Sequence, residues 1–295
     1  MRFAVVTDTS GNLQNRQVKE YDLAVIPFLY NYNGEEHTCL DTDAFDGDTF
    51  YRELKENASV TTSQINPQTY ADCFSRFLAV GRDVLYVSMS SGISGSCQSA
   101  LLGAEMALES YPDRIIEVVD TRGASLGEGL IAIRAAELRD RGYGVEEAAR
   151  RLRKLSERMF NVFTVDDLMF LKRGGRLSNL AAVFGTVLHL KPILKGDEDG
   201  RIVAFAKVRG RRHSIEALAA QYEKLVVDPE TQTVGIAHAA CRADAEYLKK
   251  LLMAHRPPQN ILVVDYEPVT GSHVGPGALA LFFESASGVR AVNAL

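Results

Sequence analysis

The segment from Ser88 to Ser96 holds the residues of this chain that are best suited to bind an anion. It consists of serine, glycine and two apolar residues, with no bulky polar side chain. The apolar run 84–87 before it predicts a buried strand, and the apolar spacing over residues 100–108 predicts a helix after it. N–H groups at the start of such a helix, with serine hydroxyls, form a site for a carboxylate or a phosphate. An ordinary serine N-cap gives the same pattern and is the simpler interpretation of this segment alone.

Polar residues also follow two other predicted strands. Residues 3–7 form a predicted buried strand that ends at the turn-forming residues 8–12, and a strand predicted over residues 114–119 ends at Asp120-Thr121. Open α/β sheets bind ligands beyond the carboxyl ends of their parallel strands, so both places are candidates for a binding site. A polar turn explains each of them equally well.

Two groups of cations form a second kind of candidate. Three cations surround a glycine pair in the segment 172–176, which resembles a phosphate-binding turn, although a charged surface turn is the commoner explanation. Arg209 begins a second cationic cluster over residues 209–213, ahead of a helix predicted over residues 215–225.

The histidine and cysteine residues are weaker candidates for a functional site. His273 lies in the glycine-rich segment 271–278, where we expect a loop next to a strand over residues 279–283; a loop histidine is more often structural than functional. The four cysteines lie far apart, without the spacing of a zinc site or a disulfide framework, and we expect them to be reduced thiols. Cys97 has no histidine or asparagine arrangement beside it, and we interpret it as a small helix residue.

The elements that would position these residues alternate between strand and helix in the first half of the chain. Helices are predicted over residues 49–57, 67–80, 126–141 and 145–159, and Asn33-Gly34 predicts a hairpin turn. This alternation predicts a mostly parallel sheet with helices on both faces.

The second half has a different pattern. Strands are predicted over residues 191–194, 201–208, 233–238 and 261–264, and a further helix over residues 243–254. The apolar stretch from Leu180 to Leu190 predicts a helix that faces the core or lines a cavity for an apolar ligand. We place the boundary near Phe160, which gives an α/β domain over residues 1–159 and a second domain over residues 160–295.

Composition restricts the classes of protein to which the chain can belong. It has 295 residues, of which 46% are hydrophobic and 24% charged, as in ordinary soluble globular proteins. Its net charge of −5 argues against a general nucleic-acid binder. No apolar run approaches the roughly 18 residues that span a bilayer, and the first residues are too short for a signal peptide core. We therefore expect a cytoplasmic protein.

Five short motifs, in this order along nearly the whole chain, resemble the DegV family of bacterial fatty-acid-binding proteins. They are Thr7-Asp8-Thr9-Ser10, Thr62-Ser63-Gln64, the serine-rich segment 90–96, Lys172-Arg173-Gly174-Gly175-Arg176 and the glycine-rich segment 271–277. The resemblance implies an α/β fold: an N-terminal α/β/α domain with a mostly parallel sheet, and a C-terminal α+β domain with a mixed sheet. It also implies that a fatty acid is held between the two domains.

The same resemblance implies a function. A DegV protein is a lipid carrier without enzymatic activity of its own: it presents the carboxylate of a long-chain fatty acid to a separate fatty acid kinase, which forms an acyl phosphate for phospholipid synthesis. Hydroxyls and backbone N–H groups suit such a carboxylate, and an apolar cavity suits the tail, which we expect to run toward residues 180–190. The residues expected at the carboxylate are Thr62, Ser94, Gly95 and His273.

Cations in both clusters are expected to dock the kinase, namely Arg173, Arg176 and Arg209. Departures from the family pattern are modest: Ile65 replaces a proline, Ser96-Cys97 replaces Thr-Tyr, and Thr121 replaces a serine. None of them removes a hydroxyl expected at the carboxylate, and we expect no cofactor, metal or nucleic acid.

Two other functions remain open. The first is a small-molecule kinase or phosphotransferase related to dihydroxyacetone kinases, whose ligand-binding part the fold resembles. The chain has no Walker-type loop and no acidic cluster suited to a magnesium nucleotide, which argues against this function. The second is a regulatory protein whose binding site is vestigial.

Overall fold

The computed structural model describes residues 2–177 and 190–291, which divide into two compact units. Unit 1 combines Met1–Phe45 with Thr61–Ser156, and unit 2 combines Asp46–Val60 with Glu157–Leu295. The division near Ser156 lies close to the boundary expected at Phe160. The segment Asp46–Val60 was expected in the first domain but groups with unit 2. The reason is tertiary: Tyr51 of this segment is buried, and its hydroxyl donates to the carbonyl of Tyr266 at 2.7 Å.

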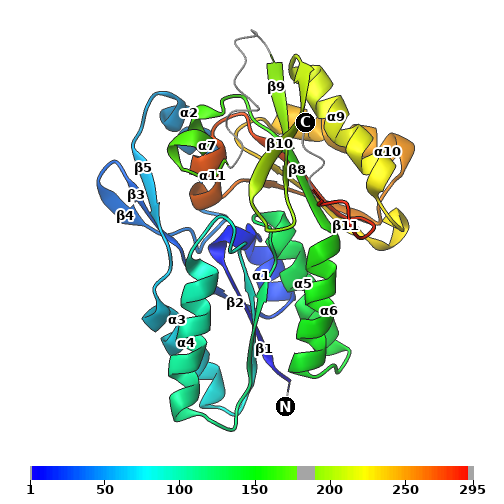
Figure 1. Cartoon of the computed structure of the whole chain (residues 1–295). Helices are drawn as coiled ribbons and strands as arrows, with labels where there is room; N and C mark the ends of the chain where they lie inside the picture. Colours follow the sequence, from blue (N-terminus) through cyan, green and yellow to red (C-terminus); the bar gives the residue numbers. More distant parts are fainter. Residues whose placement is uncertain (1, 178–189, 292–295) are drawn as a thin grey trace. The chain divides into compact units, whose positions relative to one another are not determined.

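Unit 1 is built on a four-stranded parallel sheet in the order β2-β1-β6-β7, as the strand and helix alternation predicts. The strands are β1 (Ala4–Asp8), β2 (Leu23–Ile26), β6 (Val84–Ser88) and β7 (Ile116–Asp120). Both central strands, β1 and β6, are buried along their whole length, because helices cover both faces of the sheet. Figure 1 shows the pair α3 (Pro67–Leu78) and α4 (Ser96–Ser110) on one side and α5 (Leu126–Asp140) and α6 (Val145–Arg158) on the other.

A smaller sheet in the order β4-β3-β5 completes unit 1, together with α1 (Asn15–Glu20) and the 3₁₀ turn η1 (Thr9–Gly11). Strands β3 (Leu29–Tyr32) and β4 (Glu35–His37) pair antiparallel around the predicted hairpin turn at Asn33-Gly34, where both residues have positive φ. The third strand, β5 (Val60–Ser63), contains Thr62, so this residue lies in a strand rather than in a turn.

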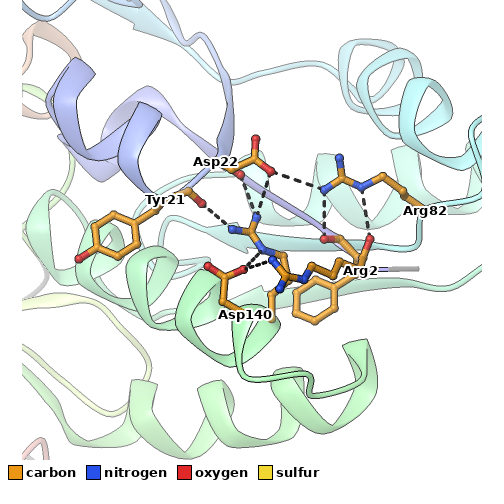
Figure 2. A network of polar contacts seen from close by, with 7 residues as sticks. Arg2, Tyr21, Asp22, Arg82 and Asp140 are labelled. Carbon is orange, nitrogen blue, oxygen red and sulfur yellow. Dashed lines mark hydrogen bonds and ion pairs between the residues drawn. The ribbon is translucent and has the colours of Figure 1, made fainter.

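A polar network lies at the amino ends of β1 and β2 in the four-stranded sheet (Figure 2). At its centre is Arg139, a buried residue of α5, which donates to the carbonyls of Tyr21 at 2.8 Å and Asp22 at 2.9 Å. Its Nε donates to Asp140 Oδ1 at 2.9 Å, and Asp140 also pairs with Arg2. Arg2, Tyr21 and Asp22 come just before β1 and β2, so the network lies at the amino ends of these strands and away from their carboxyl ends.

Unit 2 is built on a six-stranded mixed sheet in the order β10-β9-β8-β13-β11-β12, in which only β11 and β12 pair in parallel. Its strands are β8 (Met159–Thr164), β9 (Leu190–Gly196), β10 (Ile202–Arg209), β11 (Thr233–His238), β12 (Asn260–Asp265) and β13 (Leu279–Glu284). Helices α9 (Arg211–Leu225) and α10 (Arg242–His255) cover the sheet, and Tyr222 packs edge-on against Phe283 in the core beneath them.

Three short helices form a second group in unit 2. They are α2 (Gly47–Lys55), α7 (Met169–Arg173) and α11 (Pro268–Val274), and α11 packs against both of the others (Figure 1). A 3₁₀ turn, η2 (Pro229–Thr231), precedes β11.

Three segments of the chain differ from expectation or lie outside the described residues. The loop expected around His273 is wrong, because this residue lies in the last turn of α11. The helix expected over residues 180–190 falls outside the described residues except for Leu190, which begins β9. Arg211 and the two residues after it belong to the first turn of α9 rather than preceding that helix. Within residues 2–177 and 190–291, no helix combines the length and apolar character needed to cross a bilayer.

Candidate functional site

The turn between β6 and α4 is the best candidate for anion binding in unit 1. After β6 ends at Ser88, the chain turns so that Ser94 is half-buried and Gly95 is exposed at the start of α4. The N–H groups of a first helical turn lack partners within the helix, so they are available to a ligand or a capping side chain. One of them is capped here, because Ser94 Oγ accepts from the N–H of Ser96 at 3.2 Å. The serine cap and a role for Ser94 in binding are therefore both compatible with this geometry.

The second hydroxyl-rich segment lies against this turn. Gln64 packs over Gly95 so closely that a methyl group at Gly95 would come within 2.1 Å of Gln64 Oε1. The N–H of Ile65 donates to Ser96 Oγ at 3.3 Å, and Gln64 Nε2 donates to Ser99 Oγ at 3.3 Å. The structure thus brings together two motifs about thirty residues apart, and Thr62 lies in the strand that leads into this contact.

A buried group of acids and hydroxyls lies at the carboxyl end of β1. Asp8 and Glu128 are both fully buried, and the hydroxyl of Ser10 contacts Asp8 Oδ1 and, at 2.8 Å, Glu128 Oε2. The hydroxyl of Thr7 donates to Glu128 Oε1 at 2.9 Å, and that of Tyr86 donates to Asp8 Oδ2 at 2.5 Å. The polar side chains at the end of β1 therefore point into the protein. Glu128, which binds two of them, was not identified from the sequence.

One signal for Glu128 exists in the sequence. It is an acidic residue between Gly127 and Gly129 in the first turn of α5, ahead of the apolar run 130–133. Gly129 is needed there, because a methyl group at this position would come within 2.2 Å of the carbonyl oxygen of Gly11. Close packing of α5 on η1 is what brings Glu128 to Ser10.

Burial determines the charge state of the groups in this region. It raises the pKa of Asp8 from 3.8 to about 6, although hydrogen bonds from Ser10 and Tyr86 act in the opposite direction. Burial also raises the pKa of Tyr86 well above its usual value. The thiol of Cys97 is buried and its pKa is raised to about 11, mainly by loss of solvation. Cys97 is therefore protonated at neutral pH, which agrees with its interpretation as a small helix residue rather than a nucleophile.

His273 and the glycine pair of the cationic segment come together in unit 2. A methyl group at Gly174 would come within 2.3 Å of His273 Nδ1, so the glycine permits the imidazole to lie directly on the end of α7. Burial and, secondarily, the charge of Arg176 lower the pKa of His273 from 6.5 to about 4. The imidazole is therefore neutral at pH 7 and has one ring N–H to donate and one ring nitrogen to accept.

The three cations expected to dock a partner are not equivalent. Arg173 is exposed, with its guanidinium 4.7 Å from the centre of the Phe170 ring, and Arg209 is exposed at the end of β10. Arg176 is half-buried, donates to the carbonyl of Gly174 and acts on His273. Within the described ranges, no cluster of three or more histidine, cysteine, aspartate or glutamate side chains could hold a metal ion.

The chain is similar to proteins of one known family over nearly its whole length. The model of the DegV family, described as "Uncharacterised protein, DegV family", matches residues 2–286. A DegV domain-containing protein of Clostridium perfringens is 36% identical over 282 residues, which is 96% of this chain and 97% of the relative. A DegV domain-containing protein of Lactococcus lactis is 33% identical over 96% of this chain and 97% of its own length.

Solved structures match over the same extent. A fatty-acid-binding DegV family protein of Thermus thermophilus superposes with a TM-score of 0.86 at 29% identity, covering 97% of this chain and 100% of its own. The fatty acid binding protein DegV of Bacillus subtilis superposes with a TM-score of 0.83 at 28% identity, with the same coverage.

Proposed function

The chain belongs to the DegV family, and from this premise we propose that it binds a long-chain fatty acid. The observation that carries the proposal is the contact between the segment Thr62 to Ile65 and the turn at Ser94 and Gly95, at the carboxyl end of a buried parallel strand. Solved relatives described as fatty acid binding share the fold along the whole chain. The proposed ligand is therefore one whose polar end is a single carboxylate.

The carboxylate of the ligand can be bound by hydroxyl and N–H groups of the protein. A carboxylate accepts hydrogen bonds, and burying it without donors costs several kcal/mol or forces it to protonate. The hydroxyls of Thr62 and Ser94 and an N–H group at Gly95 are the donors we propose in unit 1. His273, neutral and with a ring N–H to donate, is proposed as a further contact to the carboxylate, a role that stays a prediction from the sequence.

We further propose that the protein acts as a carrier and not as an enzyme. In this role it presents the acyl carboxylate to a separate kinase, which forms an acyl phosphate for phospholipid synthesis. Arg173 and Arg209 support this part of the proposal because their guanidinium groups are exposed and available to a partner. Arg176 is a third proposed docking residue, although its guanidinium group donates to the carbonyl of Gly174, which lies against His273.

Native mass spectrometry of the purified chain tests the proposed ligand. A bound species with the mass of a long-chain fatty acid, which disappears on delipidation and returns on titration, is the expected result. A chain that neither retains nor takes up any fatty acid would contradict the proposal. Uptake of a nucleotide instead would favour the phosphotransferase alternative.

The kinase partnership needs its own test. Reversing the charge in Arg173→Glu is expected to leave fatty acid affinity unchanged and to slow acyl phosphate formation when a fatty acid kinase is added. Arg150→Glu, a reversal at an exposed arginine of α6, is the matched control and is expected to change neither. Loss of fatty acid binding in Arg173→Glu would assign this arginine to the ligand site and not to a partner.

A further inference from the structure

The acid pair Asp8 and Glu128 must share a proton. Both carboxyl groups contact the hydroxyl of Ser10, and that hydroxyl has a single hydrogen to donate. Ionised carboxylates only accept, so two of them would leave one of these contacts without a hydrogen. One proton on Glu128 satisfies both contacts: ionised Asp8 accepts from the hydroxyl of Ser10, and the protonated carboxyl group of Glu128 donates to that hydroxyl.

A row of hydroxyls leads from this pair to Ser94. Tyr86 contacts Asp8 Oδ2, and the hydroxyls of Tyr86 and Tyr70 lie 2.9 Å apart, in a contact where either can donate. The side chain of Ser96 in turn interacts with the hydroxyl of Tyr70, and Ser96 Oγ lies 3.1 Å from Ser94 Oγ. All these groups belong to unit 1, and all except Ser94 are buried.

Each hydroxyl in this row carries one hydrogen, so the direction of one bond sets the direction of the next. When Asp8 is ionised, Tyr86 donates to it and every other hydroxyl donates in the same sense, which directs the hydrogen of Ser94 to Ser96. When Asp8 takes up a second proton, on Oδ2, it donates to Tyr86, the order reverses, and Ser96 donates to Ser94. The hydrogen of Ser94 then points away from the row and is available to a bound anion.

We propose that Asp8, Tyr86 and Tyr70 are positioning residues for the anion site, and that binding of an anion at Ser94 is accompanied by uptake of a second proton at the acid pair, on Asp8. The inference rests on the proposed function, because it takes Ser94 as a contact of the fatty acid carboxylate. The proton comes from the solvent and forms one O–H bond on a carboxyl group. Each hydroxyl keeps its own hydrogen and only rotates about its C–O bond.

The surroundings of the pair make it the group that titrates. Its neighbours are Thr7 on β1, Ser10 on η1, Tyr86 on β6, Tyr70 on α3, and Ser96 and Cys97 on α4, with the charge of Asp120 acting on Cys97 from the end of β7. Burial raises the pKa values of Tyr70, Tyr86 and Cys97, so these three stay protonated near neutral pH. The pKa of Asp8, at about 6, lies where binding is measured.

Calorimetric titration of the delipidated protein with oleate tests the proposal. Titrations in buffers of different ionisation enthalpy, between about pH 6 and pH 8, give the number of protons taken up on binding. For the wild-type protein we expect uptake that approaches one proton, with affinity falling by up to about tenfold per pH unit above the pKa of the pair. Ionisation of oleate itself contributes the same proton uptake in all variants. The difference in proton uptake between variants therefore reports on the acid pair.

Two variants interrupt the row in different ways. Tyr70→Phe removes the central hydroxyl, and we expect it to bind oleate with less proton uptake and a flatter pH profile than the wild type. Asp8→Asn places a permanent N–H donor toward Tyr86, so we expect no uptake at the pair and, at pH 8, an affinity at least that of the wild type. Tyr222→Phe is the matched control, since this buried tyrosine donates to the carbonyl of Arg256 in unit 2.

The outcomes separate this inference from the proposed function. If the wild type, Tyr70→Phe and Asp8→Asn bind oleate with equal proton uptake and the same pH profile, the proposed coupling is wrong and fatty acid binding stands. If the wild type does not bind oleate at all, the proposed function fails, and this inference fails with it.

Discussion

At the scale of single residues, the hydroxyl of Ser94 has two partners on the protein and one proposed partner on the ligand. It caps the N–H of Ser96 at 3.2 Å and contacts Ser96 Oγ at 3.1 Å. Loss of the hydrogen bond from the N–H of Ser96 alone costs about 1 kcal/mol of stability. Loss of a hydrogen bond to a carboxylate costs roughly 1.5–3 kcal/mol of binding free energy. Loss of the contact within the protein therefore appears in thermal unfolding, whereas loss of the contact with the ligand appears in the binding affinity.

We expect Ser94→Ala and Thr62→Ala each to weaken fatty acid binding by roughly ten- to a hundredfold without unfolding the protein. The measurement is calorimetry of binding together with thermal unfolding of the ligand-free protein. Ser91→Ala is the matched control, because Ser91 lies in the same turn but donates to Asp120 Oδ2 at 2.6 Å. Unchanged affinity in both Ser94→Ala and Thr62→Ala would contradict the assignment of the carboxylate to these hydroxyls.

His273 is expected to affect transfer more than binding. Its pKa of about 4 keeps the imidazole neutral at pH 7, so it contributes a hydrogen bond without a full positive charge. The hydroxyl and N–H donors remain in His273→Ala, so we expect this variant to keep its fold and some affinity and to lose acyl phosphate formation more strongly. The measurement is a fatty acid titration together with a kinase assay on the same sample of His273→Ala. Equal losses in both would make His273 a simple binding contact, and no loss in either would make it structural.

At the scale of helices and turns, the position of the buried acid pair depends on how closely α5 approaches η1. A methyl group at Gly129 would come within 2.2 Å of the backbone oxygen of Gly11, and backbone cannot move aside as a side chain can. We therefore expect Gly129→Ala to lower the free energy of unfolding by about 2 kcal/mol or more. Gly144→Ala is the control, because nothing lies within 4 Å of a methyl group there. Equal stability of the two variants in chemical denaturation would show that α5 can shift at no cost.

Local signals were enough to predict most of these elements. Pro67 begins α3, Asn33-Gly34 forms the hairpin turn, and the apolar run before Ser88 is a buried strand. Each depends on backbone restrictions or on burial that a few neighbouring residues determine. The strand and helix alternation then predicted the parallel sheet of unit 1.

What the sequence could not provide depends on contacts between distant segments. Glu128 meets Thr7 and Ser10 only after α5 has packed on β1, and no pattern within either segment indicates the other. His273 was expected in a loop because glycines surround it, yet it ends a helix that begins with the side chain of Glu267 capping two N–H groups. Glycine there serves the close approach to neighbouring segments rather than loop flexibility.

At the scale of the whole molecule, unit 1 carries a buried group and unit 2 a half-buried group whose pKa values move in opposite directions. Asp8 in unit 1 rises from 3.8 to about 6, so the folded state binds its proton more tightly than the unfolded chain does. His273 in unit 2 falls from 6.5 to about 4, so the unfolded chain binds that proton more tightly. Stability rises with pH wherever the unfolded state binds more protons, and falls where the folded state does. Between about pH 4 and pH 6, acid therefore favours folding through Asp8 and opposes it through His273.

We expect this opposition to appear as a divergence between the units when the pH is lowered from 7 to about 5. The shift of Asp8 corresponds to at most about 3 kcal/mol, gained progressively as pH falls from about 6 toward 4. Hydrogen exchange followed by mass spectrometry, corrected for the intrinsic pH dependence of exchange, reports the two units separately. In Asp8→Asn the acid-dependent gain should vanish from unit 1 while unit 2 behaves as in the wild type. In His273→Gln the acid-dependent loss should vanish from unit 2 alone. If neither substitution changes the pH dependence of its own unit, then Asp8 and His273 do not govern the response of the protein to acid.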